Sequence, residues 1–208
     1  SLDELNKRSF SNIEDFYDSL PLTYPQHLKK LTLNNLPIRE INNLPPTLTY
    51  LDCSNNRNLI SITNLPSTLL TLICNDSPLL RKIDLIEGIK SFMCCNTHIS
   101  QLMLPTTLLQ LTCTLCYSLA IMNDLPPNIE QIRVDQSILE RHVTKLPNTL
   151  QEIICNYRYN DVTHQTTQVR PKRIKCSSTL KRIYYSKQHA NVIDIFEDIA
   201  STTEIISI

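Results

Sequence analysis

The stretch "LPPTLTYLDCSN", residues 44–55, is one copy of a pattern that recurs along the chain. A second copy is "LPSTLLTLICND" at 65–76, and another is "LPNTLQEIICNY" at 146–157. Copies of the pattern begin at Tyr24, Leu44, Leu65, Leu85, Leu104, Leu125, Leu146 and Cys176. Successive starts lie 19 to 21 residues apart, except the last pair, which lies 30 apart. A fixed period of this length indicates an array in which each unit stacks on the next.

Positions 5, 8 and 10 of each unit hold apolar residues or cysteine, as Leu48, Leu51 and Cys53 do in the unit that begins at Leu44. Positions 8 and 10 alternate with the variable position 9, which is the period of a β-strand. Proline at position 2 suits a stretch that donates no hydrogen bond to a sheet. Each unit therefore predicts one short strand whose apolar side chains enter a shared core.

The overall composition excludes several classes of function. Twenty basic and 20 acidic residues leave a formal net charge of zero, which gives no electrostatic case for nucleic acid or an anionic membrane. One glycine in 208 residues excludes glycine-rich loops that cradle phosphates. Turns must instead come from the 12 prolines and the many asparagines. No apolar run is long enough to span a bilayer.

The pattern L-x-x-L-x-[LC]-x-x-N resembles the leucine-rich repeat from about Tyr24 to Tyr185. The short unit "LPxxLxxLxC" is most similar to repeats of bacterial effectors of the YopM and IpaH type. This resemblance implies an α/β horseshoe solenoid with a concave parallel β-sheet and a mostly non-helical convex side. The sequence contains eight copies of the unit, and segments of six or seven residues on the convex side are too short for full helices.

Three regions follow from the repeat. Residues 1–23 are predicted to form a helical cap, because Ser11 and Glu14 make a capping box. The repeats occupy 24–187, with a polar insertion at about 157–175 that is either a solvated loop or a partner contact or import signal around "RPKRIK". Residues 188–208 are predicted to form a C-terminal cap, with a short helix around Val192, Phe196 and Ile199.

The asparagine that bonds neighbouring coils in the family is kept here only as Asn56, at position 13. The equivalent positions hold Leu36, Ser77, Thr97, Cys116, Ser137 and Arg158. Serine, threonine and cysteine can make some of the same hydrogen bonds, whereas Leu36 and Arg158 cannot. The resemblance therefore implies weaker bonding between coils at both ends of the array.

Five cysteines share position 10 and are predicted to be buried core residues, namely Cys53, Cys74, Cys94, Cys113 and Cys155. Stacked strands are not expected to offer their thiols a tetrahedral metal geometry. The repeat register also explains the CxxC pair of Cys113 and Cys116 without redox chemistry. Cys95 is the best candidate for an exposed thiol, and its pairing with His98 as ligands or nucleophile is the sharper alternative.

No histidine has an acid or a nucleophile at a supporting spacing, and no paired carboxylates recur. We therefore predict no enzyme activity, no cofactor, no metal and no small-molecule substrate. A thiol or zinc enzyme built on Cys95, His98 and Cys116 is the alternative of a different class.

Position 9 is predicted to point outward on the concave face, flanked by positions 7 and 11. The predicted partner-binding residues are Tyr50, Asp52, Ile73, Met93, Thr112, Arg133, Ile154 and Tyr184. Ile73 and Met93 fall on adjacent strands beside Tyr50, which is typical of an interface centre, although scattered surface apolar residues are the plainer interpretation. Within "LDCSNN" at 51–56, Asp52 alone is expected to look outward.

These features predict a module that binds another protein, with no nucleic acid or membrane partner. The resemblance implies a secreted bacterial effector that meets a host protein in the reducing host cytoplasm. The alternative is the substrate-targeting arm of a larger effector enzyme, such as a ubiquitin ligase.

Overall fold

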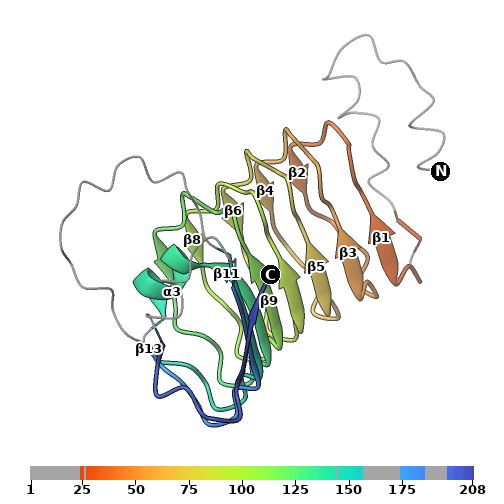
Figure 1. The fold of residues 1–208 in the computed structure, drawn as a ribbon. Helices are drawn as coiled ribbons and strands as arrows, with labels where there is room; N and C mark the ends of the chain where they lie inside the picture. The colour runs from red at the N-terminus through yellow and green to blue at the C-terminus, as the bar shows by residue number, and fades with distance from the viewer. Residues whose placement is uncertain (1–23, 26, 144, 157–173, 186–195) are drawn as a thin grey trace.

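Our computed structural model describes residues 24–25, 27–143, 145–156, 174–185 and 196–208. The chain forms a solenoid in which each coil adds one strand to a long parallel sheet (Figure 1). The predicted leucine-rich repeat fold with a parallel sheet is confirmed. The helix predicted within 1–23 lies outside the described residues.

The long sheet has nine strands, and their order in space follows their order in the chain. They are β1 (Lys30–Thr32), β3 (Tyr50–Asp52), β5 (Thr71–Ile73), β7 (Ser91–Met93), β9 (Gln110–Cys113), β11 (Gln131–Asp135), β12 (Glu152–Asn156), β14 (Arg182–Tyr185) and β16 (Glu204–Ser207). Position 8 of each repeat pairs with position 8 of the next, as in Leu51 with Leu72 and Leu72 with Phe92. These side chains are buried, so the repeat register sets the core.

A second row of two-residue strands closes the other side of the coils. It contains β2 (Glu40–Ile41), β4 (Ser61–Ile62) and β6 (Lys82–Ile83) in one sheet, β8 (Gln101–Leu102) with β10 (Ile121–Met122), and β13 (Ile174–Lys175) with β15 (Phe196–Glu197). Each of these strands buries one apolar residue, such as Ile62 or Leu102. These strands agree with the mostly non-helical convex side that the resemblance implied.

The "LPxT" motif builds the turn into the main strand in the units that carry it. The N–H of Leu48 donates to the carbonyl of Pro45 at 3.1 Å, and Leu69 does the same to Pro66 at 2.9 Å. The threonine of the motif bonds the preceding coil, since the Thr68 hydroxyl donates to the carbonyl of Leu48 at 2.8 Å. The motif therefore links coils as well as turning the chain, a role for threonine that the sequence pattern did not reveal.

Asparagine supplies the left-handed backbone that glycine usually provides. At position 12, Asn35, Asn55, Asp76 and Asn96 have φ between 53° and 61°. The short polar side chains of Asn and Asp tolerate this region better than other non-glycine residues do. Leu115 occupies the same position with φ of 65°, so one coil makes this turn with a residue poorly suited to it.

The asparagine at position 13 bonds neighbouring coils as the resemblance implied. Asn56 is fully buried, and its Nδ2 donates to the carbonyls of Leu33 at 2.6 Å and Cys53 at 2.8 Å. Its Oδ1 accepts the N–H of Leu36 at 2.7 Å. Thr97 makes part of this pattern, because its hydroxyl donates to the carbonyl of Cys94 at 3.1 Å.

One coil departs from the predicted non-helical convex side. Residues Gln136–His142 form the helix α3, which continues the row of short strands in Figure 1. Ile138 and Leu139 are buried, and Gln136 donates to Glu140 one turn later at 2.7 Å. The expectation that such segments are too short for a helix is wrong here. Among the described residues, we find no helix with the length and apolarity that crossing a bilayer requires.

The helix predicted at the C-terminal end is wrong for residues 196–208. Phe196–Glu197 form β15, and Glu204–Ser207 form β16, which pairs with β14 and adds a ninth strand to the long sheet. The open edge of β14 offers unpaired backbone groups that a strand satisfies and a helix cannot. The insertion also ends before 175, because Ile174–Lys175 form β13 and pair with β15. Residues 188–195 lie outside the described part.

Candidate functional site

The side chains at position 9 form one continuous row across the open face of the long sheet, the face predicted to be concave. Strand register pairs each member with the next: Thr32, Asp52, Ile73, Met93, Thr112, Arg133, Ile154, Tyr184 and Ile206. We call this the position-9 row. Seven of the eight predicted binding residues belong to it, and Tyr50 lies beside it at position 7. That these residues bind a partner stays a prediction.

Apolar side chains gather in two parts of the position-9 row. Ile73 and Met93 are directly paired and half-buried. Further along, Ile154 pairs with Tyr184, which pairs with Ile206. Thr112 and the exposed Arg133 separate the two parts. Ile206 was not predicted because residues 188–208 fit a helical cap, although the β-branched residues of "TEIIS" could have indicated a strand.

Asp52 does not simply look outward. Its Oδ1 accepts the N–H of Ser54 at 3.1 Å and the Ser54 hydroxyl at 2.7 Å, and its Oδ2 accepts Nδ2 of Asn34 at 3.0 Å. The carboxylate therefore holds the turn after β3 and ties it to the coil before. Of the predicted binding residues, Asp52 already has a structural role.

Position 11 also differs from the outward orientation predicted for it. Ser54, Thr114 and Asp135 are buried. The Ser54 hydroxyl accepts the N–H of Asn75 at 3.2 Å, and Oδ1 of Asn75 accepts the N–H of Cys95 at 2.8 Å. This position links coils, so the open face is formed by positions 7 and 9.

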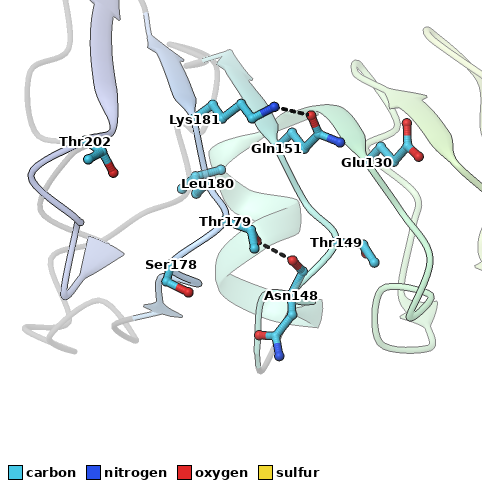
Figure 2. A pocket seen from close by; sticks show the side chains of 9 residues that line it. All are labelled: Glu130, Asn148, Thr149, Gln151, Ser178, Thr179, Leu180, Lys181 and Thr202. Carbon is cyan, nitrogen blue, oxygen red and sulfur yellow. Dashed lines mark hydrogen bonds between the residues drawn. The ribbon is translucent and has the colours of Figure 1, made fainter.

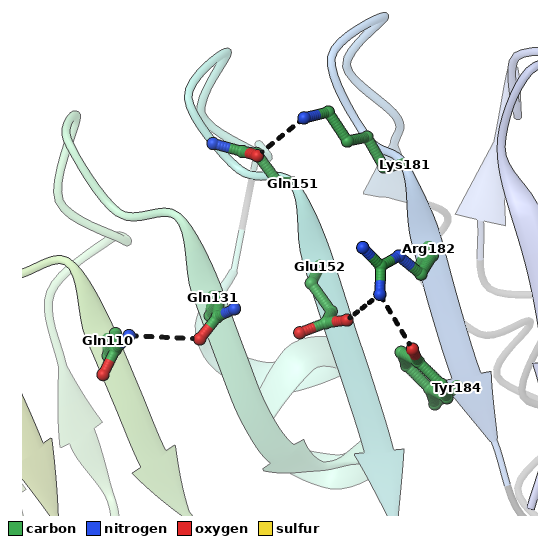
Figure 3. Close-up of polar contacts among 7 residues, drawn as sticks. All are labelled: Gln110, Gln131, Gln151, Glu152, Lys181, Arg182 and Tyr184. Carbon is green, nitrogen blue, oxygen red and sulfur yellow. Dashed lines mark hydrogen bonds and ion pairs between the residues drawn. The ribbon is translucent and has the colours of Figure 1, made fainter.

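The C-terminal part of the open face carries a polar network (Figure 3). Arg182 lies 3.4 Å from Glu152 and donates to the Tyr184 hydroxyl at 3.3 Å. Nε2 of Gln110 donates to Gln131 at 3.2 Å on the neighbouring strands. Near the first strands, the Lys30 ammonium lies 5.9 Å from the centre of the Tyr50 ring. The apolar parts are therefore bordered by polar and charged groups.

A depression of about 570 Å³ lies at the edge where the chain enters the last strands (Figure 2). Its lining residues are Glu130, Asn148, Thr149, Gln151, Ser178, Thr179, Leu180, Lys181 and Thr202. The Thr149 hydroxyl donates to the carbonyls of Pro127 and Ile129 at 2.7 and 2.8 Å, and Lys181 donates to Gln151 at 2.9 Å. These polar groups serve contacts between coils, so the depression is a groove between stacked turns.

The five cysteines predicted to be buried, Cys53, Cys74, Cys94, Cys113 and Cys155, are buried, and so is Cys116. Burial raises the pKa of Cys53 far above its usual range and that of Cys155 to about 12. Cys95 is half-buried and accepts the Thr114 hydroxyl at 3.0 Å, while Nδ1 of His98 bonds the carbonyl of Pro78. Cys95 and His98 thus have separate partners.

Three of the cysteine thiols lie close together, in a group of three and not of the four that a tetrahedral site needs. The sulfurs of Cys94, Cys113 and Cys116 all lie within 4.8 Å of one another. Hydrogen bonds with Cys113 and Cys94 lower the pKa of Cys116. The pKa of Cys94 is raised by its own hydrogen bonds with Cys113 and Cys116. The residue at position 13 faces inward, which the repeat register indicated, but its distance to the neighbouring thiols could not be read from the sequence.

Asp135 is the one acidic residue among the buried residues that the structure describes. Burial raises its pKa from 3.8 to about 6, against the lowering effect of the Leu115 N–H that it accepts at 2.7 Å. Asp135 is therefore a group of the folded chain that titrates close to neutral pH.

No protein-family model and no curated protein matches this chain. Among solved structures, it is similar to YopM from Yersinia enterocolitica WA-314, with a TM-score of 0.40 and 17% identity over 89% of this chain and 47% of that one. It is also similar to a leucine-rich repeat protein from Bacteroides ovatus ATCC 8483, with a TM-score of 0.40 and 14% identity over 86% of this chain and 63% of that one. The chain spans less than two thirds of either structure.

Proposed function

We propose that this leucine-rich repeat solenoid is a protein-binding module whose partner lies along the position-9 row. The observation that carries the proposal is the direct pairing of Ile73 with Met93 on the open face, with Tyr50 one strand away. An apolar centre bordered by polar groups is the common anatomy of a protein interface. Here Lys30 and the Glu152–Arg182 pair provide such a border.

The length of the row favours a protein over a small molecule. From Ile73 to Ile206 the row crosses six spaces between strands, which is about 29 Å at the usual strand separation. Small-molecule sites are concave and enclose most of their ligand. The two apolar parts lie on an open sheet surface, so they suit an extended partner that contacts both.

We also propose where the protein acts in the cell. The similarity of the "LPxxLxxLxC" unit to effector repeats and the eight free cysteines support a role as a bacterial effector in the reducing cytoplasm of a host cell. In this proposal the module has no catalytic role. The second candidate, a targeting arm of a larger effector enzyme such as a ubiquitin ligase, is favoured by the same surface and differs only in what the array is joined to.

The test is capture of a partner from host-cell cytosol by purified protein carrying Ile73→Asp with Met93→Arg. The matched control is Met103→Arg with Ile121→Asp, because these side chains are 54% and 55% exposed and belong to the other side of the coils. We expect the first pair to abolish capture and the second to leave it intact, with both proteins keeping the circular dichroism of the wild type. If the two double variants capture the partner equally well, the proposal that the interface lies on the open face is wrong.

A further inference from the structure

Three thiols meet inside the core between the fourth and fifth coils. Cys94 directly follows β7, Cys113 is the last residue of β9, and Cys116 lies three residues later. All three side chains are buried, and their sulfurs lie within 4.8 Å of one another. We call these residues the thiol triad.

The repeat explains why the triad forms here. Met93 pairs with Thr112, so Cys94 and Cys113, the next residue of each strand, occupy equivalent places on adjacent coils. Cys116 takes the place that Asn56 has in another coil and likewise faces inward. Its thiol donates to the carbonyl of Cys94 at 2.8 Å and hydrogen bonds with the Thr97 hydroxyl at 3.4 Å.

Among the described residues, the coils of Cys53 and Cys74 also hold cysteine at position 10 and form no such group. Three residues after Cys53 stands Asn56, and three residues after Cys74 stands Ser77. In those coils position 13 offers an amide or a hydroxyl. The triad therefore depends on Cys116, the cysteine that departs from the family pattern.

The donor set is soft and has three members. Thiolate sulfur selects copper(I), zinc or iron–sulfur clusters over hard cations. Structural zinc sites are almost always four-coordinate, and the group that the described residues bring together supplies three ligands. With metal–sulfur bonds of about 2.3 Å, a planar triangle places sulfurs about 4 Å apart. Sulfurs within 4.8 Å reach that triangle by moving about 0.5 Å each.

The turn that carries Cys116 has an unusual backbone. Leu115 has φ of 65°, at a position where other coils place Asn or Asp, and its side chain is partly exposed. A branched aliphatic residue in this region is strained, and strain of this kind concentrates at functional sites. Among the described residues with positive φ, Leu115 is the only one with an aliphatic side chain.

We propose that Cys94, Cys113 and Cys116 bind one copper(I) ion in a three-coordinate thiolate site. Binding replaces the thiol protons, which leave to solvent. The site is separate from the open face, so it stands or falls independently of the proposed protein interface.

The test is anaerobic titration of the whole chain with copper(I) in competition with a copper(I)-specific chelator. We expect one equivalent to be held, with a thiolate-to-copper absorption band and three sulfur neighbours by X-ray absorption. Cys116→Asn should lower the affinity at least tenfold. This variant restores the family-type residue and should fold as well as the wild type, which thermal unfolding will check. Cys94→Ser should also weaken binding.

Cys53→Ser and Cys155→Ser are the matched controls, because both residues are buried at position 10 outside the triad. They should keep the full affinity. The proposal is overturned if the chelator removes all copper from the wild type, or if Cys116→Asn binds as tightly as the wild type. Retention of zinc with four ligands, or an equal loss on Cys53→Ser, would overturn it as well.

Discussion

The backbone N–H of Leu115 donates to Oδ2 of Asp135 at 2.7 Å, across the space between neighbouring coils. Leu115 has a left-handed backbone that leucine rarely adopts. The bond therefore joins a strained turn to a buried carboxyl whose pKa is raised to about 6. Substitution of either residue tests one property of this contact, the backbone strain at Leu115 or the proton affinity of Asp135.

Leu115→Asn should stabilise the protein. Leucine in the left-handed region costs about 1 kcal/mol more than asparagine, which other coils use at this position. We expect the free energy of unfolding in urea to rise by about 0.5–1 kcal/mol, since the Leu115 side chain is 37% exposed and loses little packing. Leu115→Ala is the control and should show no gain from the turn. A loss of stability in the asparagine variant would mean that packing of Leu115 outweighs the strain.

Asp135→Asn should change how stability depends on pH. Because the folded chain raises the pKa of Asp135 from 3.8 to about 6, the folded state binds the proton more tightly than the unfolded state. The contribution of this group is fully present below about pH 4 and is lost as pH rises through about 6. Asparagine keeps an oxygen for the Leu115 N–H and carries no charge.

We therefore expect Asp135→Asn to match the wild type near pH 3.5 and to exceed it by about 1–3 kcal/mol at pH 7. Urea unfolding of both proteins at the two pH values measures the difference. A wild type that gains stability relative to the variant between pH 4 and 7 would contradict the assignment.

Asn56→Ala should be among the more damaging single substitutions in the array. It leaves the carbonyls of Leu33 and Cys53 and the N–H of Leu36 without their side-chain partner in a fully buried place. Each unsatisfied buried group costs about 1–3 kcal/mol, so we expect a total loss of about 3 kcal/mol or more. Asn128→Ala is the control, because Asn128 is exposed and makes one bond of 3.3 Å. Its loss should stay under about 0.5 kcal/mol.

Thiol labelling of the native protein should be fast at Cys95 and slow at the buried cysteines. Burial raises the pKa of Cys176 to about 11 and that of Cys155 to about 12, and it also blocks access to them. We expect one fast equivalent with a colorimetric disulfide reagent at pH 8, lost in Cys95→Ser. Rapid reaction of most of the eight cysteines would contradict the buried ladder.

The features that every repeat shares could be predicted from the sequence, whereas contacts that occur in a single coil could not. The period placed Ile73 beside Met93 and buried Cys53, because both follow from the register that every unit shares. It did not reveal that Asp52 is bonded to Ser54 and Asn34, since such contacts depend on side-chain reach.

The C-terminal end was mispredicted for a related reason. Val192, Phe196 and Ile199 fit a helical spacing, and the choice between helix and strand was made by the open edge of β14. A tertiary contact of this kind overrides local periodicity. The thiol triad likewise required the third dimension, because Cys116 had a sufficient explanation in the repeat register.

The near-constant spacing of the contacts between coils explains why the chain accommodates its insertion. Side-chain bonds between coils typically join residues about 20 apart, such as Thr68 with Leu48. Across the insertion the equivalent bond, from Thr179 to Leu150, joins residues 29 apart. Loop-closure entropy grows only with the logarithm of length, so this extra stretch costs about 0.3 kcal/mol. Folding that spreads from coil to coil can therefore pass the insertion at little cost in free energy.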